Sequence, residues 1–294
     1  MVKCLELKRI FDYNRGMKTI LFSQIVQEVQ NLTSACSRID GKCLEMMEAA
    51  AKSESNQNAK FALDMLIQNA KVADKNALAV CQDTGMAVFF VKIGQDVHIE
   101  GGLLTDAINE GVRRGYAQNG YRASVLDPIS RVNTKDNTPA IVHIELVGGE
   151  NMEITFLPKG FGSENMSRLF MLKPSDGVEG VKNCIVQAVK DAGANPCPPI
   201  IVGVGIGGTA EKAMEVAKEQ LLREVGKPSD DNVLADMEKE VLEKINALGI
   251  GAQGFGGDTT AFAVHIGKYP THIAALPVAV NIQCNAMRIA KAVL

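Results

Sequence analysis

Three cysteines in three separate loops are the residues of this sequence best suited to chemistry. They are Cys81, Cys197 and Cys284. They lie too far apart for a local Cys-x-x-Cys clip, but distant loops can assemble one site. Three thiolates can hold three irons of a [4Fe-4S] cluster and leave the fourth iron open. An open iron can bind a substrate oxygen as a Lewis acid, so the pattern indicates an enzyme rather than an electron carrier.

The first of these cysteines opens the string Cys81-Gln82-Asp83-Thr84-Gly85, which follows an apolar stretch. Its loop carries a thiol, an amide, a carboxylate and a hydroxyl side by side. The Asp83 carboxylate could therefore transfer a proton next to a bound substrate. The alternative is a strand-end turn that contains a buried cysteine.

The other two cysteines also lie beside predicted strands. Prolines flank Cys197 and stiffen its loop, which could fix a ligand or make a rigid turn. Cys284 follows a predicted strand and precedes a predicted short C-terminal helix, whose start would lower the pKa of its thiol. The remaining cysteines are interpreted as structural: Cys4, Cys36, Cys43 and Cys184.

Glycine-rich strings suggest two further kinds of site. Residues 203–208 match the Gly-x-Gly-x-x-Gly dinucleotide fingerprint. A second predicted helix follows where the fingerprint needs a strand, so a dinucleotide-binding oxidoreductase subunit is the less favoured alternative. Residues 159–165 and 256–260 are interpreted as anion-binding turns or as ordinary loops.

Two isolated side chains could contact a substrate carboxylate. Arg122 could clamp it through two hydrogen bonds, and His272 could donate a charged one. Spacing alone fits a surface role for Arg122 equally well. The other histidines are interpreted as surface or structural residues: His98, His143 and His265.

Composition narrows the class of protein. The 294 residues carry a net charge of −3 and no Trp, which argues against nucleic acid as a partner. No apolar run reaches the roughly 18 residues of a membrane span. The odd set of 7 cysteines in a long chain fits a reducing compartment, so we expect a cytoplasmic protein.

The periodicity predicts a mixed α and β fold, of the α+β class. A helical N-terminal segment precedes a sheet-and-helix body that carries the cysteine loops. We expect residues 1–16 to be a disordered extension or to precede the true start, and residues 17–294 to form one domain. A break lies near residues 75–85. Predicted strands span 87–93, 140–147, 152–157, 199–206, 261–266 and 274–280, and predicted helices span 104–117, 178–192, 209–222 and 234–248.

Several strings together resemble the class I, iron–sulfur-dependent fumarate hydratases. The match is to their N-terminal half or α subunit, which is shared with L(+)-tartrate dehydratase. The strings run in the family's order and are CQDTG (81–85), PKGFGSEN (158–165), NPCPP (195–199), GVGIGGTAEKA (203–213), GFGGDTTA (254–261) and THIAALPVAVNIQC (271–284). Two departures, at Phe161 and Asp258, could alter substrate contacts.

The resemblance implies a [4Fe-4S] hydro-lyase that hydrates or dehydrates a C4 dicarboxylate. The first choice is fumarate and malate, with a place in the tricarboxylic acid cycle, and the runner-up is L-tartrate. It implies that Cys81, Cys197 and Cys284 bind the cluster and that Asp83 has a catalytic role. It implies substrate contacts by Gln82, Arg122, Gly162 and His272.

The resemblance also implies a partner. Single-chain members of the family continue into a second domain, so we expect a β subunit and an α2β2 assembly. A non-catalytic iron–sulfur scaffold is the third hypothesis.

Overall fold

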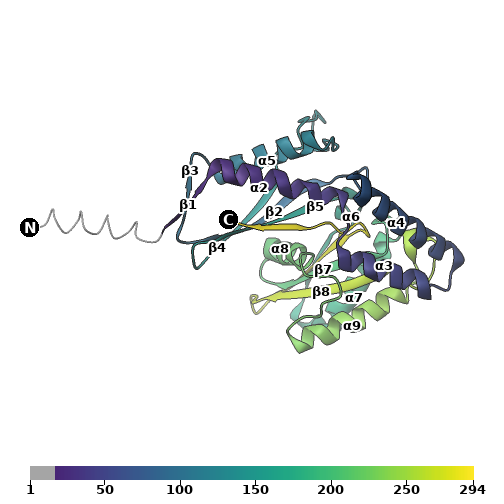
Figure 1. Ribbon diagram of the computed structural model, residues 1–294. Coiled ribbons are helices and arrows are strands. Elements are labelled where there is room, and N and C mark those ends of the chain that lie inside the picture. Colours follow the sequence, from purple (N-terminus) through teal and green to yellow (C-terminus); the bar gives the residue numbers. More distant parts are fainter. Residues whose placement is uncertain (1–16) are drawn as a thin grey trace, which may run out of the picture. The chain divides into compact units, whose positions relative to one another are not determined.

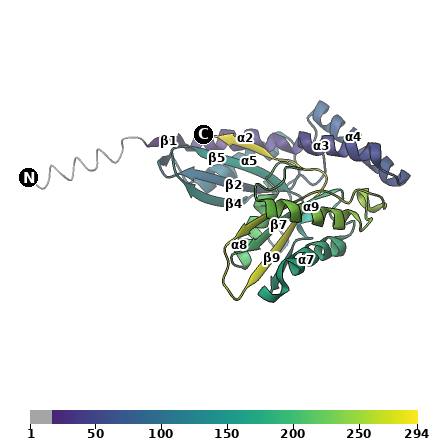
Figure 2. The ribbon, with the colours of Figure 1, turned by 90° about the horizontal axis from the view of Figure 1, so that it is seen from below.

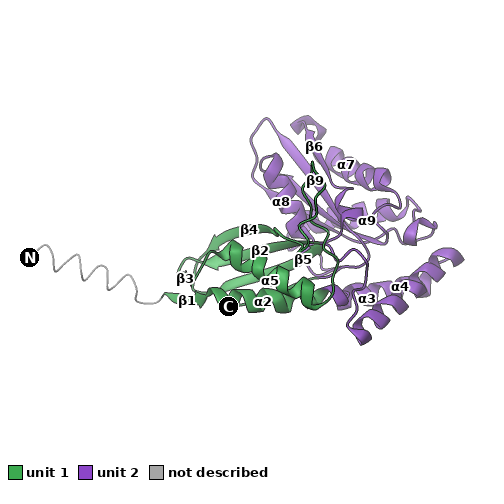
Figure 3. Cartoon of the chain, turned by 90° about the horizontal axis from the view of Figure 1, so that it is seen from above, with its two compact units in different colours: residues 1–35, 86–158, 289–294 green, residues 36–85, 159–288 purple. Residues whose placement is uncertain are grey.

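The computed structural model describes residues 17–294, which fold into two compact units (Figures 1 and 3). Unit 1 comprises residues 17–35, 86–158 and 289–294, and unit 2 comprises the segments between them. The chain passes between the units four times, once at the end of the break expected near residues 75–85. Because no single cut separates the units, one domain over residues 17–294 stays our prediction. The predicted extension, residues 1–16, lies outside the described residues.

Unit 1 is a sheet with two helices. Its four-stranded sheet has the order β10-β5-β2-β4, in which β2 and β4 are parallel and β10 is antiparallel to β5. The strands are β2 (Met86–Gly94), β4 (Ile141–Val147), β5 (Met152–Lys159) and β10 (Ala290–Val293), with a separate parallel pair of β1 (Lys18–Leu21) and β3 (Val97–Glu100). The helices are α2 (Phe22–Leu32) and α5 (Leu104–Gln118), which lie side by side (Figure 1).

Unit 2 is a sheet covered by helices on both faces (Figure 2). The sheet has the order β6-β9-β7-β8; β7 and β8 are parallel, and β9 is antiparallel to β6 and β7. Its strands are β6 (Arg168–Leu172), β7 (Ile200–Gly207), β8 (Ala261–Tyr269) and β9 (Leu276–Gln283). Its helices are α3 (Gly41–Ser53), α4 (Gln57–Asn76), α6 (Phe161–Glu164), α7 (Gly177–Ala192), α8 (Ala210–Gln220) and α9 (Asn232–Asn246). Short 3₁₀ turns span Thr33–Ser37, Pro174–Asp176 and Ala252–Gly254.

Side-chain caps fix where three helices of unit 2 begin. Asp40 accepts a hydrogen bond from Cys43 N, and Asn56 accepts from two amides of the first turn of α4. Asp231 does the same for α9. Such caps satisfy amides that have no partner inside the helix, and each contributes about 1 kcal/mol.

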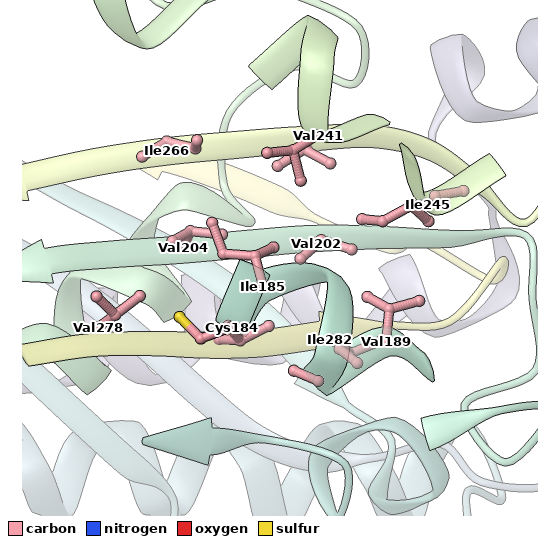
Figure 4. Packing of buried hydrophobic residues seen from close by; sticks show 14 of the residues in the cluster. Cys184, Ile185, Val189, Val202, Val204, Val241, Ile245, Ile266, Val278 and Ile282 are labelled. Carbon is pink, nitrogen blue, oxygen red and sulfur yellow. The ribbon is translucent and has the colours of Figure 1, made fainter. Parts of the chain in front are cut away.

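Alternating side chains of β7 divide the core of unit 2 into two faces. Val202 and Val204 point toward α7 and α9, where an apolar cluster of Val, Ile and Leu side chains forms (Figure 4). Gly203 and Gly205 lie on the opposite face, against α8. The period of two residues in a strand produces this division.

The predicted mixed α and β class is confirmed, and most predicted elements appear within a few residues of their expected bounds. The predicted C-terminal helix is wrong. After Cys284 the chain forms a loop and then β10, which pairs antiparallel with β5. The Ala-rich ending favours helix locally, but pairing with a distant strand overrides that preference. Within residues 17–294, no helix is long and apolar enough to cross a membrane.

Candidate active site

Strand pairing brings two of the three cysteine loops to the same end of the sheet in unit 2. Cys197 lies shortly before β7, and Cys284 directly follows β9. The two strands are antiparallel, with Ile201 opposite Gln283. The start of β7 therefore lies beside the end of β9, and both cysteines lie at that end of the sheet.

Hydrogen bonds hold these two loops together. The carbonyl oxygen of Cys197 accepts from Asn285 Nδ2 at 2.7 Å and from Asn285 N at 3.3 Å. Gln253 binds the next carbonyl, that of Pro198, through its backbone N at 2.8 Å and its side-chain Nε2 at 2.9 Å. Cys197 has a φ of +55°, a left-handed conformation that costs a non-glycine residue free energy. The neighbouring contacts keep it there.

The third cysteine joins the same place. Cys81 and Cys284 both pack against a small apolar cluster that includes Val80 and Ala286. The helix α4 fixes the approach to Cys81, because Asn69 Nδ2 donates to Val80 O at 2.8 Å. Burial, and then the nearby Cys284 and Cys81, raise the pKa of Cys197. The three thiols thus lie near enough to influence one another.

Exposure separates these thiols from the other cysteines of the described chain. Cys197 is exposed, and Cys81 and Cys284 are half-buried. Three of the cysteines interpreted as structural are buried: Cys36, Cys43 and Cys184. The fourth, Cys4, lies outside the described residues. Burial raises the pKa of Cys43 to about 12 and that of Cys184 to about 11, which keeps both as inert thiols.

The carboxylate of Asp83 is held by two backbone amides. Its Oδ1 accepts from Gly85 N at 3.0 Å, and its Oδ2 accepts from Phe161 N at 2.9 Å. The buried Arg288 donates to the Asp83 carbonyl at 3.2 Å. The carboxylate therefore has a fixed orientation in the turn that follows Cys81.

The loop that precedes and contains α6 borders both cysteine turns. A Cβ atom at Gly160 would lie 3.3 Å from Asp83 Oδ2, and one at Gly162 would lie 3.5 Å from the carbonyl of Asn195, two residues before Cys197. Gly162 and Asp83 are thus brought to the cysteine loops. Gln82 lies beside them in sequence and is exposed.

Within unit 2, His272 is not brought to these loops, and the remaining predicted substrate ligand, Arg122, lies in unit 1. Arg122 is exposed and belongs to unit 1, whereas the other predicted site residues belong to unit 2. His272 is exposed in the connection between β8 and β9, which is at the opposite end of β9 from Cys284. The eight residues of β9 separate those ends by about 25 Å. Both substrate roles stay predictions.

The helix predicted to begin after Cys284 is absent, and a different contact adjoins its sulfur. Gln283 Nε2 donates to Cys284 Sγ at 3.6 Å. Hydrogen bonds to sulfur are one of the means by which proteins tune iron–sulfur sites. This contact, and not a helix start, is the local feature beside the predicted ligand Cys284.

The donor set fits a [4Fe-4S] cluster: three accessible thiols on rigid loops, one of them already accepting a hydrogen bond. Among residues 17–294, no three His, Cys, Asp or Glu side chains lie close enough to share a single metal ion. Each cysteine of a cluster binds a different iron, so its ligands stand farther apart than those of one ion. The chemistry of the donor set, three cysteine thiols, is therefore the observation that fits a cluster.

Both predicted anion-binding turns already bind a carboxylate of the chain itself. Asp83 accepts from the amide of Phe161, as described above. In the second turn, Glu54 accepts from Asp258 N at 3.0 and 3.1 Å, and a Cβ at Gly257 would lie 2.5 Å from Glu54 Oε1. The second turn therefore has a structural role that explains its glycines.

The dinucleotide-like string is explained by packing. A Cβ at Gly203 would lie 2.2 Å from Ala217 O, and one at Gly205 would lie 2.1 Å from Ala213 O. These glycines let α8 approach β7 closely, a use that requires no nucleotide. The main support for the oxidoreductase alternative is thereby removed.

Sequence reasoning missed residues that hold the site in place. Asn285 joins two cysteine loops and Arg288 supports the Asp83 turn, as described above. Lys159 is buried beside the Cys284 loop. The only sequence signal was position, because Asn285 adjoins a predicted ligand and Lys159 lies within a noted glycine turn.

Comparison with known proteins identifies the family. The sequence model of the fumarate hydratase (Fumerase) family matches residues 26–293. A protein of Methanocaldococcus jannaschii named "Putative L(+)-tartrate dehydratase subunit alpha" is 45% identical over 248 residues, which are 82% of this chain and 87% of that protein. The L(+)-tartrate dehydratase subunit alpha of Escherichia coli K12 is 28% identical over 90% of this chain and 89% of its own length.

A longer relative shares the same region. The "Putative fumarate hydratase class I" of Geobacillus stearothermophilus is 29% identical over 83% of this chain, which corresponds to 49% of that protein. The chain belongs to the fumarate hydratase family, a family of hydro-lyases. The resemblance read from the six strings is confirmed.

Proposed function

We propose that this chain is the α subunit of a [4Fe-4S] hydro-lyase that adds water to, or removes it from, a C4 dicarboxylate. The observation that carries the proposal is the convergence of three thiols beside the fixed Asp83 carboxylate. Membership of the fumarate hydratase family supports the same reaction class.

Cys81, Cys197 and Cys284 would hold the cluster, each from its own loop. When bound, the cluster supplies an open iron that polarises the hydroxyl group of the substrate. The rigid loops described above keep the three sulfur atoms in one arrangement. The hydrogen bond from Asn285 to the Cys197 carbonyl joins the Cys197 loop to the Cys284 loop and so fixes two of the sulfur positions.

Asp83 would hold or move the proton of the reaction at its carboxylate. Both of its oxygens accept one backbone hydrogen bond, and each retains a lone pair for a proton. The two amides orient the carboxylate before substrate arrives, which reduces the cost of reaching the reactive geometry.

Substrate recognition is assigned to Gln82, Gly162, Arg122 and His272. The exposed Gln82 amide and the Gly162 backbone adjoin the cysteine loops and could bind one end of the dicarboxylate. The charged side chains of Arg122 and His272 suit its carboxylates chemically, although their positions give no support.

A β subunit would complete the enzyme, in a heterotetramer of two α and two β chains in the cytoplasm. Relatives that this chain matches over most of their length are named as alpha subunits, which supports the need for a second chain. Two-fold assemblies are the commonest kind, which supports the stoichiometry.

Fumarate with malate is the first substrate choice, and L-tartrate is the second. Because the 45% identical relative is named as a tartrate dehydratase subunit, L-tartrate is tested at the same concentrations as malate and fumarate. The test is turnover by the reconstituted complex of this chain with its β subunit, given malate, fumarate or L-tartrate. Hydration or dehydration of at least one of these compounds is expected; a complex that contains a full cluster yet turns over none would refute the proposal.

A further inference from the structure

The side chain of Lys159 is buried at the end of β5, with 1% of the residue exposed. Its Nζ lies 2.9 Å from Ser163 Oγ, 2.8 Å from the carbonyl oxygen of Ile282 and 3.2 Å from Glu164 Oε2. Ile282 is two residues before Cys284. A buried amine thus holds the backbone that leads to a predicted cluster ligand.

The hydrogen-bond partners of this amine fit an ammonium group. The Ser163 hydroxyl donates its own hydrogen to Gly160 O at 3.1 Å, so Ser163 Oγ must accept from Lys159. A carbonyl and a carboxylate are the other two partners, and both only accept. Three acceptors need three N–H donors, which only the charged form supplies. Burial lowers the pKa of Lys159, and Glu164 and Cys284 oppose that shift.

The network around this ammonium carries more positive than negative charge. Glu164 accepts from Lys218 at 2.6 Å and from Asn281 Nδ2 at 3.0 Å, besides its contact with Lys159. Burial acts to raise the pKa of Glu164, but the two lysines outweigh it and lower that pKa. One carboxylate thus faces two ammonium groups. Lys218 is partly exposed, but the Lys159 ammonium is fully buried, and a buried charge is costly unless anions lie nearby.

A thiolate at Cys284, two residues after Ile282, would be such an anion. We propose that Lys159 is a positioning residue that places a positive charge beside the backbone leading to the Cys284 ligand and holds that backbone through the Ile282 carbonyl. This inference rests on the proposed function, because the surplus charge is balanced when Cys284 ligates an iron–sulfur cluster. Charge near a cluster changes its reduction potential, and residues that support ligands change cluster affinity.

The same lysine reaches the Asp83 side of the site. Lys159 binds Ser163, and the Ser163 hydroxyl binds Gly160 at the start of α6. The next residue, Phe161, donates its amide to Asp83 Oδ2. One buried side chain therefore supports both the proposed ligand loop and the proposed proton-transfer group.

The experiment measures the cluster rather than turnover. The α–β complex is reconstituted anaerobically as wild type, Lys159→Met, Glu164→Gln and Lys218→Met. The cluster's reduction potential and its lifetime against an iron chelator are recorded. Lys159→Met removes positive charge and should shift the potential negative and shorten the lifetime about tenfold. Glu164→Gln removes negative charge and should shift the potential positive.

Lys218→Met is the matched control, because Lys218 shares the Glu164 carboxylate but does not bind the Ile282 carbonyl. It should change the cluster lifetime less than Lys159→Met does. Potential shifts of the same sign in the Lys159 and Glu164 variants, or a wild-type lifetime in Lys159→Met, would overturn the inference. If Lys159→Met does not fold, the sign of the Glu164→Gln shift decides alone. A wild-type complex that binds no iron would instead refute the proposed function.

Discussion

Two residues of the candidate site, Asp83 and Cys197, are held by hydrogen bonds from segments distant in the sequence. Asp83 lies in the turn after Cys81, yet an amide of α6 holds one of its oxygens. Cys197 occupies a left-handed conformation, yet Asn285 holds its carbonyl. The chemistry assigned to single residues therefore depends on contacts between segments that are distant in the sequence.

Replacing Asp83 by asparagine should remove proton transfer and leave the cluster intact. We expect kcat to fall about 10²- to 10⁴-fold, the usual contribution of a general acid or base. The measurement is kcat for the preferred dicarboxylate, together with iron content. Asp191→Asn, on the exposed surface of α7, is the control and should behave as wild type. A change of less than twofold in Asp83→Asn would show that this carboxylate is not the proton-transfer group.

Gly162→Ala tests substrate binding at the α6 loop. The new Cβ would make an ordinary contact of 3.5 Å with Asn195 O, so stability should change by less than about 0.5 kcal/mol. If a substrate carboxylate approaches this backbone, the methyl group should raise KM several-fold. Steady-state kinetics and a melting curve on the same sample separate the two effects. An unchanged KM would remove Gly162 from the substrate site.

At the scale of elements, close packing of α8 on β7 explains the glycine string. Gly205→Ala would place a Cβ 2.1 Å from the carbonyl of Ala213, so the helix would have to move. Overpacking of this kind costs about 1–3 kcal/mol or more. Gly41→Ala is the control, since no heavy atom lies within 4 Å of its added Cβ. A lowered melting temperature in Gly205→Ala alone is expected, and equal melting temperatures would contradict the packing explanation.

A histidine on β8 makes unit 2 sensitive to acid. Burial, and then the nearby Arg223, lower the pKa of His265 from 6.5 to about 4. Its Nδ1 lies 3.1 Å from the carbonyl of Gln220, so the neutral ring donates there. Between those pH values the unfolded chain binds a proton that the folded chain does not, so stability falls as pH decreases. The loss should reach about 2 kcal/mol by pH 5.

Urea unfolding at pH 7.5 and pH 5 measures this effect. His265→Gln keeps a hydrogen-bond donor without a titrating group, so its stability should fall less over the same interval. The same pH dependence in both proteins would show that His265 does not cause the acid sensitivity.

The success of sequence reasoning varied with the range of the interactions. The meeting of the three cysteine loops could be predicted because each loop adjoins a predicted strand, and strands of one sheet end close together. The secondary structure of the residues after Cys284 could not be predicted, because β10 forms by pairing with the distant strand β5. The role of Lys159 was equally hidden, since burial and a count of acceptors require tertiary structure. The glycines of 203–208 fit two explanations until α8 was seen to fill the space.

At the scale of the whole molecule, the site is predicted to need a second chain. The described residues offer Asp83 beside the thiols, and water must be excluded around a bound substrate. We expect the cluster-loaded α chain to be inactive alone and to become active on mixing with its β subunit. Sedimentation of the mixture should reveal an α2β2 complex. Full hydro-lyase activity of the isolated α chain would contradict the two-chain account.

The central claim is that Cys81, Cys197 and Cys284 together hold one cluster. The direct measurement is iron and sulfide content after anaerobic reconstitution of the wild-type complex and of each Cys→Ala variant, with Cys184→Ala as the buried control. Wild type and Cys184→Ala should contain about four irons per α chain. Each of the other three variants should lose most of this iron. A full complement of iron in all three would contradict the account.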